Sequence, residues 1–235
     1  MGKDSFSFRR FTVRQDRCAM KVGTDGTLLG AWANGGRRVL DIGTGSGLLA
    51  LMMAQRFADA SITGVEIDPD AAAQAQENVE ASPFAERVTI VCGDICSWEP
   101  DVAEGYDAIV CNPPYFANDL HCPDQRRTLA RHDTTLTFAM LMAVAKRMLA
   151  DDGELSVVVP TSAASRIEAE AALAGFEMRR RWAVRTTPAK EPGRWLMAFG
   201  RHSAALFDSG EGVIETSPGV RSEWYGELTK QFYLK

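Results

Sequence analysis

The sequence predicts a doubly wound α/β protein, in which helices cover both faces of a mostly parallel sheet. From residue 37 onward, short apolar runs typical of strands alternate with longer stretches typical of helices. The first strand-like runs are continuously apolar rather than alternating, as strands buried on both faces are. Ligands of such sheets bind at the carboxyl ends of the strands, so we expect a site there.

The first four predicted strands and two helices alternate in the first half of the chain. The strand-like runs lie at residues 37–43, 60–68, 86–94 and 106–112, and the helix-like stretches at residues 46–57 and 69–81. Proline is tolerated in the first turn of a helix, so Pro69 is a suitable first residue for the second helix.

The second half continues the same alternation and ends in two strands joined by a loop. We expect a helix at residues 136–149, a turn at 151–153, a strand at 154–160, a helix at 162–175, and strands at 176–186 and 193–202. A glycine commonly ends a helix, and Gly175 stands at that position.

The two ends of the chain have a different pattern. Residues 5–15 alternate aromatic and polar side chains, as an edge strand does, and residues 23–36 predict a short helix. We therefore interpret residues 1–36 as a small N-terminal lid. Residues 37–202 form the main domain, and residues 203–235, with a predicted helix and an aromatic tail, form an extension packed on that domain.

Length and composition indicate one core and a reducing environment. The chain has 235 residues, of which 46% are apolar. No apolar run reaches the roughly 18 residues of a membrane span, and the N-terminus has no secretory signal. The five cysteines are an odd number, so we expect no disulfide framework, and Cys92 and Cys96 have neither a second pair nor a nearby histidine, so we expect no metal site. A cytoplasmic location fits best.

The charge is distributed unevenly along the chain. The net charge of −5 argues against a simple basic nucleic-acid binder. Residues 37–111 carry a net charge of −9, whereas residues 1–36 and residues 112–202 each carry +3. The basic parts are suited to face a polyanion, although ordinary surface variation explains the pattern equally well.

A glycine-rich loop follows the first predicted strand of the main domain. Gly43, Gly45 and Gly47 lie closer together than the glycines of the dinucleotide fingerprint, and Asp41 directly precedes the loop. A carboxylate is a poor neighbour for a pyrophosphate and a good one for a cation. S-adenosylmethionine is a nucleoside without phosphates that carries ammonium and sulfonium charges, so it is the cofactor that fits.

Polar side chains also end the following strands. Glu66 ends the second strand, where a carboxylate can accept hydrogen bonds from ribose hydroxyl groups. Asp94 ends the third strand and can accept a proton from an adenine amino group, with Ile95 covering the ring. Asn112 ends the fourth strand. These positions, with Asp41, predict one pocket.

The motifs VLDIGTGSG, GVEIDP, CGDI and NPPY together resemble a class I S-adenosylmethionine-dependent methyltransferase over residues 37–202. The resemblance implies a Rossmann-like sheet of seven strands, of which the last is antiparallel. It also implies S-adenosylmethionine as the cofactor.

The NPPY segment resembles the motif of methyltransferases that act on amino groups. The lone pair of such a nitrogen is delocalised, and two acceptors around it favour a more sp3-like amine as it attacks the methyl group. The side-chain oxygen of Asn112, also beside the cofactor, and the carbonyl of Pro113 can serve as those acceptors. Tyr115 is suited to stack on a base, and Phe116 adjoins it.

The motif does not decide which amino group is methylated. It is shared by enzymes acting on adenine N6, on guanine N2 in ribosomal RNA, or on a glutamine amide in release factors. Release-factor enzymes usually have a longer N-terminal domain, and the guanine enzymes more often have phenylalanine in place of Tyr115. An inactive methyltransferase-fold RNA-binding factor is a further alternative.

The stretches flanking these motifs resemble the bacterial tRNA1(Val) (adenine-N6)-methyltransferase family nearly end to end. The resemblance implies tRNA, bound through its anticodon loop, as the substrate, and no obligate protein partner is evident. We expect three groups of basic residues to contact it: Arg126, Arg127 and Arg131 after the motif, Arg9, Arg10, Arg14 and Lys21 near the N-terminus, and a cluster at residues 179–194 touching the stem. Alternatively, Lys21 and Asp25 reach the methionine end of the cofactor.

Overall fold

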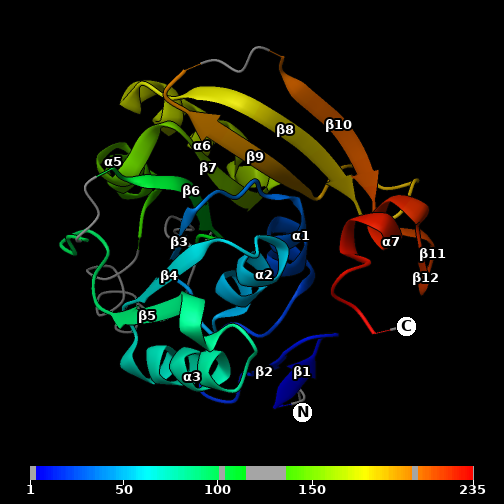
Figure 1. Ribbon diagram of the computed structural model, residues 1–235. Helices are drawn as coiled ribbons and strands as arrows, with labels where there is room; N and C mark the ends of the chain where they lie inside the picture. The colour runs from blue at the N-terminus through cyan, green and yellow to red at the C-terminus, as the bar shows by residue number, and fades with distance from the viewer. Residues whose placement is uncertain (1–3, 101–103, 115–135, 203–205, 235) are drawn as a thin grey trace, which may run out of the picture.

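The structure is a computed structural model that describes residues 4–100, 104–114, 136–202 and 206–234. Its central sheet comprises β3 (Arg38–Ile42), β4 (Ser61–Glu66), β5 (Val88–Cys92), β6 (Tyr106–Cys111), β7 (Leu149–Pro160), β8 (Glu177–Arg185), β9 (Arg194–Gly200) and β10 (Asp208–Val213). The strand order is β10-β8-β9-β7-β6-β3-β4-β5, and Figure 1 shows the sheet from β5 to β10.

The expected seven strands are present as β3 to β9. Strands β3, β4, β5, β6 and β7 pair in parallel, whereas β9 pairs antiparallel with both β7 and β8. The antiparallel last strand of the seven is therefore confirmed. Helices on both faces complete the doubly wound α/β fold.

An eighth strand, β10, was not expected and extends the sheet beside β8 in parallel. Its sequence lacks the apolar pattern of a strand because glycines occupy its packing positions. A β-carbon at Gly210 would lie 2.9 Å from the ring of Trp182, and one at Gly212 would lie 2.2 Å from the ring of Trp224. The two stacked indoles therefore supply the apolar cover that the strand lacks.

Strand β7 begins earlier than the sequence indicates. The turn expected at residues 151–153 lies inside the strand. The pairing with β6 shifts between Tyr106, opposite Leu149, and Ala108, opposite Glu154, so the strand bulges at the predicted turn. A glycine and two aspartates at a bulge resemble a turn in sequence, which explains the error.

The helices of the structure are α1 (Thr24–Trp32), α2 (Leu48–Arg56), α3 (Pro69–Glu80), α5 (Phe138–Met148), α6 (Thr161–Ala174) and α7 (Glu223–Thr229), with a short 3-10 helix at Ala85–Arg87. The sheet separates two hydrophobic cores. Val39 on β3 belongs to the core that includes Leu51 of α2, whereas its neighbour Leu40 belongs to the core that includes Leu141 of α5. Consecutive residues of β3 thus face opposite layers of helices.

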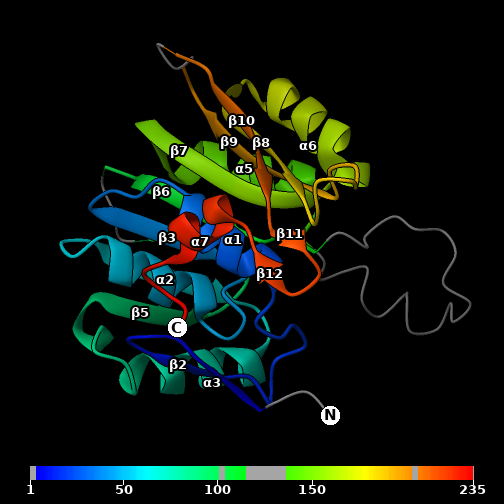
Figure 2. The same cartoon turned by 90° about the vertical axis from the view of Figure 1, so that its right-hand side faces the viewer.

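The two ends of the chain meet on the same side of the molecule. Instead of one edge strand, residues 5–15 form a separate hairpin of β1 (Ser5–Ser7) and β2 (Thr12–Arg14), while β11 (Glu215–Ser217) pairs with β12 (Val220–Arg221). The amide of Arg9 donates to the carbonyl of Phe232 at 2.8 Å, and Figures 1 and 2 show the C-terminal segment beside this hairpin. The division at residues 36 and 202 stays a prediction.

Candidate functional site

The carboxyl ends of four parallel strands bring the predicted residues together. Ile42 on β3 pairs with Val65 on β4 and with Cys111 on β6. The residues that directly follow, namely Gly43, Glu66 and Asn112, therefore lie side by side at one edge of the sheet. The order in the sheet explains why positions far apart in sequence can share one pocket.

Two adjoining cavities lie at this edge. The larger has a volume of about 610 Å3 and is lined by the glycine loop, by Asn112 and Pro114, and by residues preceding and beginning α1. The smaller, of about 70 Å3, is lined by Asp94 and Ile95. Glu66 lines both cavities and marks their junction.

The glycine loop leaves open space toward the larger cavity. Gly43, Gly45 and Gly47 have φ values of 68°, 55° and 80°, in the left-handed region that favours glycine. A β-carbon at Gly43 would meet no atom within 4 Å, whereas one at Gly47 would lie 3.4 Å from Ala75. The first glycine thus borders space for a ligand, whereas the third lies against α3, where its positive φ is what favours glycine.

Glu66 is held in place by backbone amides. Its Oε2 accepts a hydrogen bond from the amide of Gly45 at 2.8 Å, and its Oε1 accepts one from the amide of Asp68 at 3.0 Å. Each carboxylate oxygen can accept a further hydrogen bond. A fixed, half-buried acceptor at the junction of the cavities suits a ribose diol.

Asp94 and Ile95 border the smaller cavity. The Oδ1 of Asp94 accepts a hydrogen bond from the amide of Cys96 at 2.9 Å, which fixes the carboxylate after β5. The side chain of Ile95 is only 8% exposed. The cavity thus combines a hydrogen-bond acceptor with an apolar wall, as an adenine ring requires.

Asp41 lies beneath the glycine loop and lines neither cavity. Its Oδ2 accepts hydrogen bonds from the hydroxyl of Thr44 at 2.5 Å and from the amide of Ala50 at 3.0 Å. Burial raises the pKa of the carboxyl to about 7 in spite of these two bonds, and the charge of Glu66 adds to the rise. In this position the carboxyl supports the loop, and its expected contact with a cationic ligand stays a prediction.

The described part of the NPPY segment faces the larger cavity. Asn112 is half-buried and lines that cavity together with the exposed Pro114, whereas Pro113 is buried. The other predicted substrate contacts lie outside the described residues: Tyr115, Phe116, Arg126, Arg127 and Arg131.

Sequence analysis missed an ion pair in the wall of the larger cavity. The Oδ1 of Asp25, on α1, lies 2.6 Å from the Nε of Arg194, at the start of β9. Both residues line the cavity. In the sequence, Arg194 belongs to the basic cluster at residues 179–194 that we expect to touch an RNA stem. No spacing in the sequence relates these two positions, which only the antiparallel path of β9 brings together.

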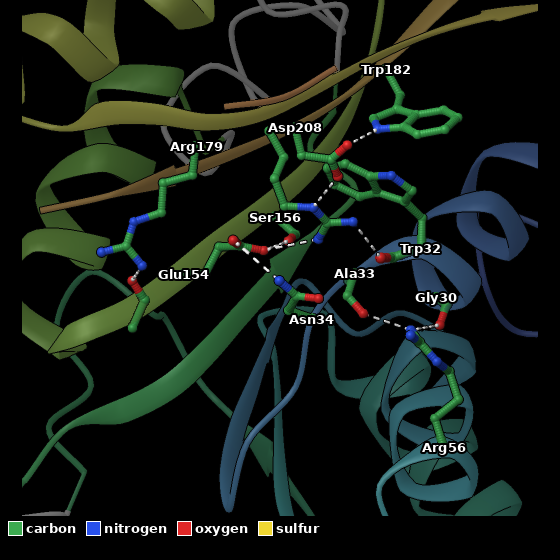
Figure 3. A network of polar contacts seen from close by, with 12 residues as sticks. Gly30, Trp32, Ala33, Asn34, Arg56, Glu154, Ser156, Arg179, Trp182 and Asp208 are labelled. Carbon is green, nitrogen blue, oxygen red and sulfur yellow. Dashed lines mark hydrogen bonds and ion pairs between the residues drawn. The ribbon is translucent and has the colours of Figure 1, made fainter. Parts of the chain in front are cut away.

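Other arginines of that basic cluster have partners within the fold (Figure 3). Arg180 pairs with Glu154 at 3.1 Å and with Asp208 at 3.2 Å, and its guanidinium lies 3.7 Å from the ring centre of Trp32. Arg179 donates to the carbonyl of Asp152. These contacts are internal and stabilise the fold, and the expected contact of the cluster with an RNA stem stays a prediction.

Two classes of feature are absent from the part of the chain that the structure describes. None of the helices there is long and apolar enough to cross a membrane. Within the same ranges, no group of three or more histidine, cysteine, aspartate or glutamate side chains is arranged to hold a metal ion.

Comparison with known proteins gives matches in sequence over the whole chain. Residues 24–177 match the family described as "Methyltransferase small domain". Curated relatives named tRNA1(Val) (adenine(37)-N6)-methyltransferase include one from Aeromonas hydrophila, 48% identical over 239 residues with 100% of both chains covered. The relative from Bacteroides thetaiotaomicron is 44% identical over 238 residues, which cover 100% of this chain and 99% of the relative.

Solved structures with low sequence identity share the fold. A predicted O-methyltransferase from Agrobacterium tumefaciens has a TM-score of 0.68 at 19% identity, covering 88% of this chain and 96% of its own. A glycopeptide N-methyltransferase in complex with S-adenosylmethionine has a TM-score of 0.57 at 15% identity, covering 78% and 90% of the two chains. These likenesses concern the arrangement of sheet and helices.

Proposed function

The chain belongs to the family of tRNA1(Val) (adenine(37)-N6)-methyltransferases, and on that premise we propose that it methylates N6 of the adenine next to the anticodon in tRNA. The observation that carries the proposal is an identity of 43–48% to curated members over nearly all of both chains. The chain is thus an S-adenosylmethionine-dependent enzyme, and we assign it to the cytoplasm.

The residues at the carboxyl edge of the sheet fit the cofactor. The open space beside Gly43 gives a ligand access to the loop, and the carboxylates of Glu66 and Asp94 that line the cavities disfavour a pyrophosphate there. Glu66 would hold the ribose, while Asp94 and Ile95 would hold the adenine ring. When bound, S-adenosylmethionine supplies an electrophilic methyl group on a positively charged sulfur.

Asn112 and Pro113 would orient the amino group of the target base. A side-chain oxygen and a backbone carbonyl accept hydrogen bonds from its two N–H groups, which directs the nitrogen lone pair toward the methyl donor. Pro113 contributes no amide hydrogen, and its ring restricts φ, so its carbonyl is held with little freedom. Such placement is the main contribution of a protein to an in-line displacement.

Moving the target base out of its stack costs little free energy in the proposed substrate. A base in an anticodon loop is already single-stranded, so the cost of unpairing that a duplex imposes is absent. The cavity beside Asn112, with about 610 Å3, has room for a base next to the cofactor. The basic residues before residue 36, together with Arg126, Arg127 and Arg131, are suited to the phosphates of the loop.

Transfer of labelled methyl groups to separate pools of tRNA, ribosomal RNA and release factor tests the proposal. We expect label in tRNA and N6-methyladenosine on nucleoside analysis. N2-methylguanosine in ribosomal RNA, or methylglutamine in release factor, would instead assign the protein to one of the related activities. Tight cofactor binding without any transfer would indicate a binding factor.

A further inference from the structure

The ion pair between Asp25 and Arg194 is placed unusually for a structural contact. The Nε of Arg194 lies 2.6 Å from the Oδ1 of Asp25, and the two side chains are 23% and 32% exposed. Both line the larger cavity, together with the glycine loop and Asn112. The pair therefore faces the space in which the reactants meet.

Each member of the pair keeps hydrogen-bonding capacity. A guanidinium has five N–H donors in a planar fork, and the ion pair with Asp25 is made at the Nε of Arg194 without a well-aligned hydrogen bond. Within the described residues, no hydrogen bond engages the two terminal nitrogens of Arg194 or the Oδ2 of Asp25. The pair thus offers a set of donors and an acceptor side by side.

The order of the two cavities determines which end of the cofactor meets this pair. The smaller cavity, with Asp94 and Ile95, suits the adenine ring, and Glu66 at the junction suits the ribose. The remainder of the cofactor then extends into the larger cavity. That remainder ends in an α-ammonium group, opposite in charge to Asp25, and an α-carboxylate group, opposite in charge to Arg194.

We propose that Asp25 and Arg194 together bind the α-amino acid group of S-adenosylmethionine. Asp25 accepts a hydrogen bond from the ammonium group, and the terminal nitrogens of Arg194 donate to the carboxylate. This proposal rests on the cofactor assignment in the proposed function and adds the residues that recognise its methionine end.

The carboxylate of Asp25 favours an amino acid over an RNA phosphate as the ligand. A phosphate drawn to Arg194 would approach Asp25 as well and be repelled by it, whereas an ammonium group beside a carboxylate satisfies both charges. Lys21, which also lines the larger cavity, donates an ammonium hydrogen to the carbonyl of Gln15. Its charge is thus directed to the protein backbone.

Calorimetric titration of the full chain without RNA tests the proposal with three ligands. These are S-adenosylmethionine, its decarboxylated analogue, and 5′-methylthioadenosine, which lacks the whole amino acid group. Arg194→Met should weaken S-adenosylmethionine binding by about tenfold to a hundredfold, the usual effect of a lost hydrogen bond to a charged group. Its affinity for the two analogues should equal that of the wild type, because neither has a carboxylate.

Asp25→Asn should give a different pattern. It should weaken the binding of both S-adenosylmethionine and the decarboxylated analogue, which keeps the ammonium group, and leave 5′-methylthioadenosine unaffected. Arg194→Lys should recover part of the affinity lost in Arg194→Met, because it keeps the charge without the fork.

Arg201→Met is the matched control. Arg201 follows the other end of β9, is 28% exposed, and lies 3.7 Å from Asp151 in an ion pair of the same type. It lines neither cavity, so its loss should leave the affinity for all three ligands unchanged.

Two results would overturn the proposal. The first is that Arg194→Met binds S-adenosylmethionine as tightly as the wild type does. If this variant then shows only a higher apparent Michaelis constant for tRNA, Arg194 is an RNA contact. The second is that the variants of Asp25 and Arg194 lose the same factor of affinity for all three ligands, which would show that the pair only supports the fold. A failure of tRNA methylation with the predicted binding pattern intact would instead contradict the proposed function.

Discussion

The side-chain amide of Asn78, on α3, donates a hydrogen bond of 2.8 Å to the backbone carbonyl of Ser46 in the glycine loop. The same amide donates to the carbonyl of Arg14 at 2.8 Å, and its oxygen accepts from the amide of Arg14 at 2.8 Å. Asn78 is 2% exposed. One buried side chain therefore holds the N-terminal hairpin and the cofactor loop in fixed relative positions.

Replacing this amide should loosen both segments. We expect Asn78→Ala to lower the free energy of unfolding by about 1–3 kcal/mol, because the buried carbonyl of Ser46 and the part-buried backbone groups of Arg14 lose their partner. The affinity for S-adenosylmethionine should fall as well. Denaturant titration and calorimetry measure the two effects. Gln76→Ala, which removes an exposed bond to Glu80 on the same helix, is the control; equal behaviour of both variants would refute the role of Asn78.

Glu66 should affect the cofactor more than the fold. Glu66→Ala removes the proposed ribose acceptor and the partner of the amide of Gly45, so we expect at least a tenfold weaker affinity for S-adenosylmethionine. Glu66→Gln keeps an acceptor oxygen and should lose less. Equilibrium binding to the two variants measures this, and an unchanged dissociation constant for Glu66→Ala would show that the ribose assignment is wrong.

Arg180 should be needed for stability rather than for RNA binding. Its side chain is 14% exposed and that of Glu154 is 9% exposed, so Arg180→Met leaves a buried carboxylate without its cation. Removing one member of a buried ion pair lowers the free energy of unfolding by about 3–5 kcal/mol. Thermal unfolding should reveal the loss, while the tRNA affinity of the folded fraction stays constant. A large loss of tRNA affinity at unchanged stability would restore the predicted RNA contact.

Asp41 should make stability depend on pH. Its pKa is about 7 in the folded protein, against 3.8 for an aspartate carboxyl in water, so the folded state keeps a proton that the unfolded chain releases. Its contribution is fully present below about pH 4 and is lost as the pH rises to about 7. Asp41→Asn cannot titrate.

From pH 4 to pH 7 the free energy of unfolding of the wild type should therefore fall relative to that of Asp41→Asn. Denaturant titrations at several pH values measure it. Parallel pH profiles for the two proteins would contradict a raised pKa at this position.

Sequence patterns predicted the features that depend on local chemistry. Continuous apolar runs indicated β3 to β6, and Pro69 indicated the start of α3. The closely spaced glycines indicated the loop, and in the structure their φ values are positive. Backbone sterics and burial impose these patterns over a few residues, so one sequence suffices to read them.

Features that depend on packing between distant segments could not be predicted. The pairing of Asp25 with Arg194, the bonds of Asn78, and the glycines of β10 beneath Trp182 are set by how strands and helices meet. Likewise, a carboxylate before a glycine loop does not reveal which way it points, and Asp41 proved to lie beneath the loop. Nothing within a short stretch of sequence encodes such relationships.

The central claim is that Asn112 presents N6 of a tRNA adenine to the cofactor. The most direct measurement is nucleoside mass analysis of tRNA1(Val) after incubation with S-adenosylmethionine and either the wild type or Asn112→Ala, with cofactor affinity measured alongside. We predict N6-methyladenosine next to the anticodon with the wild type and none with the variant, whose cofactor affinity stays within a few fold. Equal amounts of N6-methyladenosine from both proteins, or none from the wild type, would contradict the account.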